Sequence, residues 1–261
     1  MFRPLVLGFS LVLAALPALA QPQKSIRVGV TAGPHAGVLG AVKKVAASRG
    51  LDITVVEFTD YVIPNQALAQ KDIEINSFQH EPYLKNQIAK TGWKLTKVAY
   101  TTASPMGFYS KRHKSFAELP QGGTVAIQND PTNAARSLQL LHEHGVIRLK
   151  DPSDTSASLL DIAENPKRLR FVELDAAQLP RSLPDVDAAA VNNNYAVQAG
   201  LDPQKDAILK EGLEGPWVNI IAVREEDKDQ PWVRDFVDAY RSEPVREFLQ
   251  TRFKGAYVPT W

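Results

Sequence analysis

Residues 124–138 constrain the fold of this 261-residue chain more than any other stretch. They begin with alternating apolar side chains typical of a buried strand, and Asp130 and Pro131 then mark a helix start, because Asp is a good N-cap and Pro is tolerated at the first helical position. Arg136 lies one turn into that helix, on the face that it shares with Thr132. Free backbone N–H groups at the helix start, together with an arginine, favour the binding of a carboxylate.

The same order of strand, polar turn and helix recurs along the chain, which predicts an α/β fold with parallel sheets. In such sheets ligands lie beyond the carboxyl ends of the strands. Four strand ends have polar or aromatic residues, two in the first half of the chain and two in the second, near residues 31–35, 78–83, 129–136 and 192–195. The pattern indicates a ligand held between two lobes.

The chain passes between these lobes twice. Residues 101–105 lead into a second series of strands and helices, and the apolar strand at residues 217–223 returns to the first. We therefore expect lobe I to contain residues 21–101 and 218–261, and lobe II residues 102–217. Two connections of this kind form a hinge that lets the lobes close over a ligand.

The polar and aromatic residues at these junctions suit a free amino acid. Arg136 and the helix start suit its carboxylate, and the side-chain carbonyls of Asn192 and Asn219 suit its ammonium group. An aromatic wall favours an apolar or thioether side chain. The complete set of predicted ligand-binding residues is Tyr61, Phe78, His80, Tyr83, Asn129, Thr132, Arg136, Asn192, Tyr195 and Asn219.

Six motifs in the right order resemble the methionine-binding proteins of the MetQ/NlpA lipoprotein family. They are GVTAGPH (29–35), DYVIPN (60–65), NSFQHEPYL (76–84), NDPTNAARSL (129–138), ENPK (164–167) and QLPRSL (178–183). The resemblance implies a two-lobed, type II-like periplasmic binding protein that delivers methionine, expected as the L form, to the permease and ATPase of an ABC importer. It also implies a side-chain pocket lined by Tyr61, Phe78, His80 and Tyr83, a carboxylate held by Arg136, and an amino group held by Asn192 and Asn219.

The first twenty residues are typical of a cleavable signal peptide. Arg3 precedes an apolar run at residues 5–16 that is too short to span a bilayer, and the segment ends at Ala20 in an A-x-A-like cleavage site. The family resembled is usually lipid-anchored through a cysteine after this peptide, whereas this sequence has Gln21 there and no cysteine at all. We therefore expect a periplasmic protein without a lipid anchor.

Other function classes have little support in the sequence. The 30 basic and 29 acidic side chains form no basic run of the kind that binds nucleic acid. The five histidines are scattered, His142 and His144 face different sides of a helix, and no G-x-S-x-G elbow, dinucleotide fingerprint or phosphate loop occurs. We expect a monomer with no metal, cofactor or catalytic residues. The open alternatives are another amino acid or a methionine-containing dipeptide as ligand and, less favoured, a metal-binding component or an enzyme on the same fold.

Overall fold

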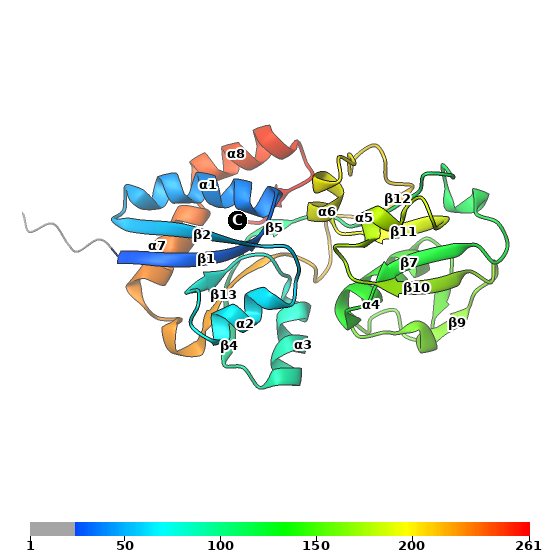
Figure 1. The fold of residues 1–261 in the computed structure, drawn as a ribbon, viewed down its shortest axis with the longest axis horizontal. Coiled ribbons are helices and arrows are strands. Elements are labelled where there is room, and N and C mark those ends of the chain that lie inside the picture. Colours follow the sequence, from blue (N-terminus) through cyan, green and yellow to red (C-terminus); the bar gives the residue numbers. More distant parts are fainter. Residues whose placement is uncertain (1–23) are drawn as a thin grey trace, which may run out of the picture.

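The computed structural model describes residues 24–261, which form two α/β lobes lying end to end (Figure 1). Each lobe is built around an open five-stranded sheet. The predicted fold class, two open and mostly parallel sheets flanked by helices, is confirmed. The predicted signal peptide lies outside the described residues.

Lobe I contains the sheet with strand order β2-β1-β3-β13-β4. Strands β1, β2 and β3 are parallel, and β13 runs antiparallel to both of its neighbours because it belongs to the chain that returns from lobe II. The elements of this lobe are β1 (Lys24–Thr31), α1 (Pro34–Ala47), β2 (Leu51–Phe58), α2 (Ile63–Ala69), β3 (Ile75–Asn76), α3 (Glu81–Thr91), β4 (Leu95–Tyr100), β13 (Ile220–Arg224), η3 (Glu225–Asp227), α7 (Pro231–Tyr240), α8 (Glu243–Phe253) and β14 (Val258–Pro259).

Strand β13 shows why the lobe I sheet is covered on both faces. Successive strand residues point to opposite faces. Ile221 and Val223 therefore pack into one core with α1, α7 and α8, whereas Ile220 and Ala222 pack into a second core with residues of α2 and α3. Figure 1 shows α1 and α8 on one side of the sheet and α2 and α3 on the other.

Lobe II contains the sheet with strand order β10-β7-β11-β6-β12. Strands β10, β7 and β11 are parallel, and β6 is antiparallel to β11 and β12. The elements of this part of the chain are β5 (Thr102–Ala103), β6 (Gly107–Tyr109), η1 (Phe116–Glu118), β7 (Thr124–Gln128), α4 (Pro131–Glu143), β8 (Arg148–Leu149), η2 (Leu159–Asp161), β9 (Ile162–Glu164), β10 (Arg170–Leu174), α5 (Leu179–Ser182), β11 (Ala188–Val191), α6 (Asn193–Gln198) and β12 (Leu209–Lys210).

One local prediction is wrong. The sequence indicates a helix over residues 159–164, but the helical turn η2 ends at Asp161 and the chain continues as β9. Ser158 and Asp161 form a capping box that supports a single turn. Ile162 is then extended and pairs with Leu149, so strand pairing replaces the second turn of the helix.

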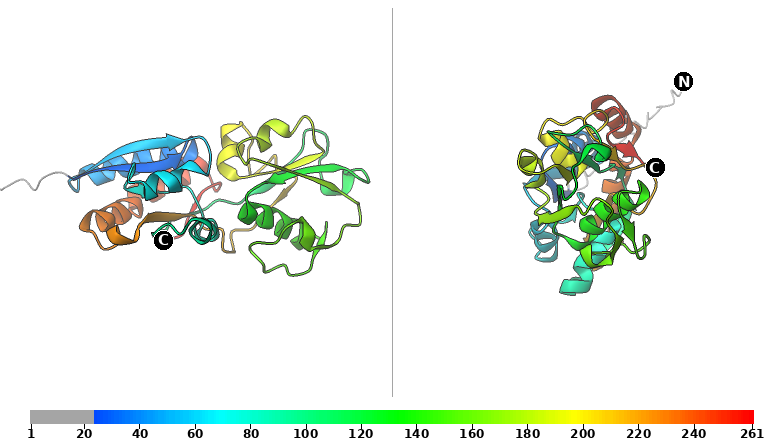
Figure 2. Two further views of the ribbon diagram at one scale, coloured as in Figure 1. Left: turned by 60° about the horizontal axis from the view of Figure 1, so that its bottom comes forward. Right: turned by 90° about the vertical axis from the view of Figure 1, so that its right-hand side faces the viewer.

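The two connections between the lobes run side by side. The backbone N–H of Thr101 donates to the carbonyl of Asn219 (2.8 Å), and the N–H of Asn219 donates to the carbonyl of Thr102 (2.9 Å). The C-terminal strand β14 joins them by pairing antiparallel with β5. Figure 2 shows these segments running between the two lobes. Although this is where the sequence places the hinge, the exact lobe boundaries at residues 101/102 and 217/218 stay a prediction.

The lobes also touch away from these connections. Gly33 precedes α1 with a φ of 82°, in the left-handed region that favours glycine. A Cβ atom there would lie 2.7 Å from the side chain of Gln198, at the end of α6 in lobe II. Glycine therefore permits the close approach of the lobes, and the Gln198 amide donates a hydrogen bond to the carbonyl of Ala32.

Candidate functional site

A cavity lies between the two lobes. Its empty space is about 360 Å³, a figure that includes the open mouth of the cavity. Both lobes contribute polar and aromatic side chains to its walls. The lining residues are His35, Tyr61, Phe78, Gln79, His80, Tyr83, Ser104, Asn133, Arg136, Asn192, Asn193, Asn194 and Asn219.

Helix α4 begins as the sequence predicts. The Asp130 carboxylate accepts a hydrogen bond from the backbone N–H of Asn133 (2.9 Å), and Pro131 occupies the first turn. The Asn133 amide also donates to both oxygens of this carboxylate, at 3.1 and 2.9 Å. Asn133 and Arg136 are one turn apart on the same helix face, so the cap directs both side chains toward the cavity.

Arg136 is buried and forms an ion pair that the sequence does not reveal. Its Nε and Nη2 atoms donate to the two carboxylate oxygens of Glu211, at 2.7 and 2.6 Å. Nη2 also donates to the Ser104 carbonyl (3.2 Å). The two donors Nε and Nη2, which could have bound a ligand carboxylate together, are thus occupied by a protein carboxylate. Within residues 24–261 only Nη1 is left without a hydrogen bond and available to a ligand.

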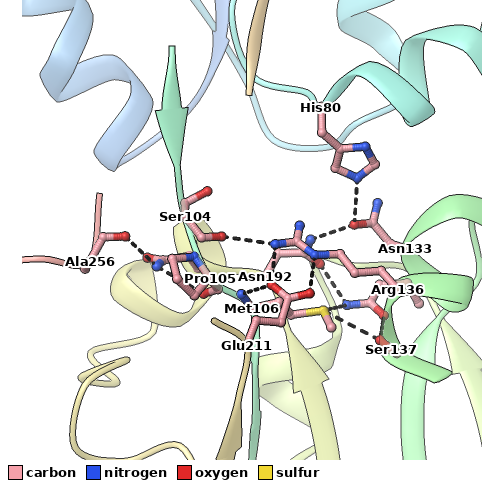
Figure 3. A network of polar contacts seen from close by, with 12 residues as sticks. His80, Ser104, Pro105, Met106, Asn133, Arg136, Ser137, Asn192, Glu211 and Ala256 are labelled. Atoms are coloured by element: carbon pink, nitrogen blue, oxygen red, sulfur yellow. Dashed lines mark hydrogen bonds and ion pairs between the residues drawn. The ribbon is translucent and has the colours of Figure 1, made fainter. Parts of the chain in front are cut away.

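Buried side-chain amides connect α4 to the neighbouring strands of lobe II. The Ser137 hydroxyl donates to Gln128 Oε1 (2.6 Å), and Gln128 Nε2 donates to Asn192 Oδ1 (2.8 Å). Asn192 Nδ2 then donates to Asn133 Oδ1 (2.9 Å), as Figure 3 shows. Since a carbonyl oxygen has two lone pairs, Asn192 Oδ1 can still accept one bond from a ligand ammonium, in a fixed orientation.

His80 extends this chain of hydrogen bonds into lobe I. Its Nδ1 accepts from the backbone N–H of Tyr83 (3.2 Å) and so caps α3, which leaves the proton on Nε2, 3.3 Å from Asn133 Oδ1 (Figure 3). Burial, with a smaller effect of the Arg136 charge, lowers the pKa of His80 to about 3. The ring is therefore neutral at physiological pH. Trp217 packs against it edge-on, with the ring centroids 5.0 Å apart.

Three aromatic rings form a wall in lobe I. The ring centroid of Tyr61 lies 5.9 Å from that of Phe78 and 6.3 Å from that of Tyr83, and the latter two are 6.2 Å apart. The Tyr83 hydroxyl donates to the Tyr61 carbonyl (2.8 Å), which fixes the wall. Burial raises the pKa of Tyr61 well above its usual value, so its hydroxyl stays protonated and donates to Asn194 Oδ1 (2.6 Å).

Several polar atoms at the cavity have no partner within the described part of the chain. Asn193 Oδ1 and Asn194 Nδ2 are buried without a hydrogen bond. Asn219, a residue that is 6% exposed, makes no side-chain hydrogen bond with residues 24–261, although its backbone is fully bonded. Because buried polar groups are nearly always paired, these atoms are candidates for contact with a ligand or water.

The structure brings together seven of the ten predicted site residues, namely Tyr61, Phe78, His80, Tyr83, Arg136, Asn192 and Asn219. The other three do not line the cavity. Asn129 precedes the helix cap and is exposed to solvent. The Thr132 hydroxyl turns back to Asp130 (3.1 Å), and the Tyr195 hydroxyl donates across the lobes to the Thr59 carbonyl (3.1 Å). Local turn geometry therefore keeps Asn129 and Thr132 out of the cavity, and a contact between the lobes keeps Tyr195 out of it.

The sequence misses other residues of this site. Glu211 follows a two-residue strand in a segment with no helical or strand period, and it lies 75 positions from Arg136. Its pairing depends on how the return connection crosses lobe II, so no local signal predicts it. Asn133 and His35 belong to motifs of the resemblance, and they could have been selected from those motifs. Burial lowers the pKa of His35 to about 4, so it too is neutral.

The described residues have neither a metal-binding cluster nor a membrane-spanning helix. Between residues 24 and 261 there is no group of three or more His, Cys, Asp or Glu side chains arranged to hold a metal ion. In the same range no helix has the length and apolar character needed to cross a membrane.

Comparison with known proteins agrees with the resemblance seen in the sequence. The family model described as NlpA lipoprotein matches residues 26–261. The chain is 46% identical to the D-methionine-binding lipoprotein MetQ of Escherichia coli (strain K12) over 253 residues, which cover 95% of this chain and 93% of that protein.

Solved structures give the same result. A nutrient binding protein from Burkholderia cenocepacia bound to methionine is 52% identical, with a TM-score of 0.89 over 90% of this chain and all of that one. An ABC transporter periplasmic substrate-binding protein from Coxiella burnetii is 44% identical, with a TM-score of 0.87 and the same coverage.

These names contradict one prediction. We expected a protein without a lipid anchor, on the ground that the sequence has no cysteine. The matching family and the Escherichia coli relative are both named lipoproteins, so the absence of cysteine is not a sufficient basis for that expectation.

Proposed function

Because this chain belongs to the NlpA lipoprotein family, we propose that it binds methionine between its two lobes and delivers it to an ABC importer. The chemistry of the cavity is the observation that supports this best. A buried arginine whose Nη1 amino group is free lies among side-chain amides, and a wall of three aromatic rings lines the same cavity. The methionine bound to the Burkholderia cenocepacia relative agrees with a cavity that has one polar part and one aromatic part.

Each part of the cavity then has a role in the proposal. Arg136 Nη1 binds the ligand carboxylate. The side-chain oxygens of Asn192 and Asn219 accept hydrogen bonds from the ammonium group. Tyr61 and Phe78, with Tyr83, surround the thioether, because sulfur gains modestly from contact with aromatic rings.

Delivery to a transporter is supported by the name of the Coxiella burnetii relative and by the two-lobed fold. We propose residues 21–101 and 218–261 as lobe I and residues 102–217 as lobe II, with closure about the paired connections at Thr101 and Asn219. The partner in this proposal is a permease with its ATPase, which takes up the ligand when the lobes open.

We propose binding rather than catalysis, since the relatives are named for binding and the two cavity histidines are held neutral by burial. The ligand itself has two alternatives, another amino acid and a methionine-containing dipeptide. The stereochemistry of the ligand is also open to test, because we expect the L form, whereas the name of the Escherichia coli relative specifies D-methionine.

The test begins with mass spectrometry of small molecules released when the purified protein is denatured. Calorimetry on refolded, ligand-free protein follows, with L-methionine, D-methionine, other amino acids and methionine-containing dipeptides. We expect methionine to bind most tightly. Failure of every amino acid and dipeptide in the panel to bind would refute the proposed function.

Arg136→Ala tests the role of the guanidinium. It should weaken methionine binding by about 2–5 kcal/mol, because the buried carboxylate of the ligand loses its charged partner. Arg148→Ala is the matched control, since Arg148 is also paired with a glutamate but lies on the surface. Unchanged affinity in the Arg136 variant would show that the carboxylate is held elsewhere.

A further inference from the structure

The ion pair of Arg136 and Glu211 is the most constrained charged group at the cavity. Glu211 Oε1 accepts from Nε (2.7 Å), and Oε2 accepts both from Nη2 (2.6 Å) and from the backbone N–H of Met106 (2.7 Å). The two side chains are only 5% and 11% exposed. Figure 3 shows the carboxylate of Glu211 facing the guanidinium within this network.

Such a pair acts as one nearly neutral unit. A single buried charge is costly, and the carboxylate offsets the arginine charge before any ligand arrives. The fork also fixes the guanidinium, because Nη2 is held by Ser104 as well as by Glu211. Nη1 is therefore presented to the cavity with a defined position and a largely compensated charge.

The other ionisable groups nearby do not restore a positive charge. His35 and His80 are neutral at physiological pH, and the lining tyrosines stay protonated. Asp130 accepts four hydrogen bonds from Asn133 and Thr132 at the positive end of α4, and burial raises the pKa of its carboxyl group. Among residues 24–261 the cavity thus has no excess positive charge for a purely anionic ligand.

We propose that Glu211 makes this site selective for zwitterions over anions of the same shape, an inference that rests on the proposed binding of methionine. A carboxylate without an ammonium group adds a second negative charge to a guanidinium that is already neutralised. A zwitterion adds no net charge, and its ammonium group meets the side-chain oxygens of Asn192 and Asn219. Glu211 acts through Arg136, so it is a positioning and specificity residue.

The experiment compares two probes of almost equal size by calorimetry at pH 7. L-Methionine is the zwitterion, and 2-hydroxy-4-(methylthio)butanoate replaces its ammonium group by a hydroxyl and is an anion. We expect the wild type to prefer methionine, and Glu211→Gln to reduce that preference at least about tenfold, which is about 1.4 kcal/mol at 25 °C. Glu211→Asp, which keeps the charge, should retain it.

Glu164→Gln is the matched control, because Glu164 also pairs with an arginine but is exposed, and it should leave the preference unchanged. Equal weakening of both probes in Glu211→Gln would overturn the inference and make Glu211 merely structural. If Glu211→Gln does not fold, the wild-type affinities for the two probes decide the question, since equal affinities would also overturn the inference. A wild type that binds neither probe would instead refute the proposed function.

Discussion

His80 should make the ligand-free protein less stable as the pH falls below about 6.5. In the fold its pKa is lowered from 6.5 to about 3, because the ring is buried. Between these two values the unfolded chain binds a proton that the folded chain does not bind. The free energy of unfolding therefore decreases as the pH falls through this window. Above pH 6.5 the histidine is neutral in both states, and the protein keeps its full stability with respect to His80.

The size of the effect follows from the same two pKa values. A solution pH of 4.5 is two units below the pKa of 6.5 of the unfolded histidine, which is therefore almost fully protonated, while the folded one remains neutral. At about 1.4 kcal/mol per unit, His80 should cost about 3 kcal/mol at pH 4.5 relative to neutral pH. That is a large part of the 5–15 kcal/mol that typically stabilises a domain.

Urea unfolding of wild type and His80→Asn at pH 7.5 and pH 4.5 measures this cost. Asparagine does not titrate, and its side-chain oxygen can still accept from the Tyr83 N–H at the start of α3. We expect the wild type to lose about 2–3 kcal/mol more than the variant between the two pH values. Other titrating groups, His35 included, contribute equally to both proteins and cancel.

His144→Asn provides the control, because His144 is exposed and its replacement should leave the loss between pH 7.5 and pH 4.5 unchanged. The same loss in wild type and His80→Asn would refute the reasoning. It would mean that the His80 ring accepts a proton in the folded state without cost, and so is not held neutral by burial.

Two further predictions concern single side chains. Asn219→Ala should weaken methionine binding by about 1–3 kcal/mol in calorimetry without lowering the melting temperature of ligand-free protein, because its amide has no hydrogen bond within residues 24–261; a lower melting temperature would identify Asn219 as structural. Lys167→Met should lower the free energy of unfolding in urea by about 1–3 kcal/mol, because the ammonium donates to the carbonyls of Phe116, Ala117 and Leu119 at 3.0, 2.6 and 2.8 Å. Unchanged stability would show that water replaces these bonds.

Features specified by adjacent residues were predictable from the sequence. The start of α4 is one of them, because Asp130 and Pro131 act on the backbone of their own helix. The inward position of Arg136 follows from the period of that helix. The role of the lysine in the ENPK motif was not predictable from its neighbours in the sequence. In the structure Lys167 contacts carbonyls about 50 residues away.

Features that depend on distant segments were not predictable in the same way. Glu211 reaches Arg136 only because the return connection passes beside the Ser104 segment. Asn129 and Thr132 lie in the predicted motif, but a residue just before a cap faces solvent and a hydroxyl in the first turn bonds to the cap itself. A position in the sequence close to residues that line the cavity is thus a poor guide to which side chains enter it.

The position of Trp217 gives the protein an internal optical reporter. Its ring lies 5.5 Å from the Arg136 guanidinium and against His80, on a connection between the lobes. Indole fluorescence responds to nearby charge and to the exclusion of water, and under the proposed function both change, because a ligand carboxylate reaches Arg136 and the lobes close. Binding and closure should therefore be visible in the intrinsic emission of the unlabelled protein, and Trp217→Phe should abolish that signal while the other three tryptophans remain.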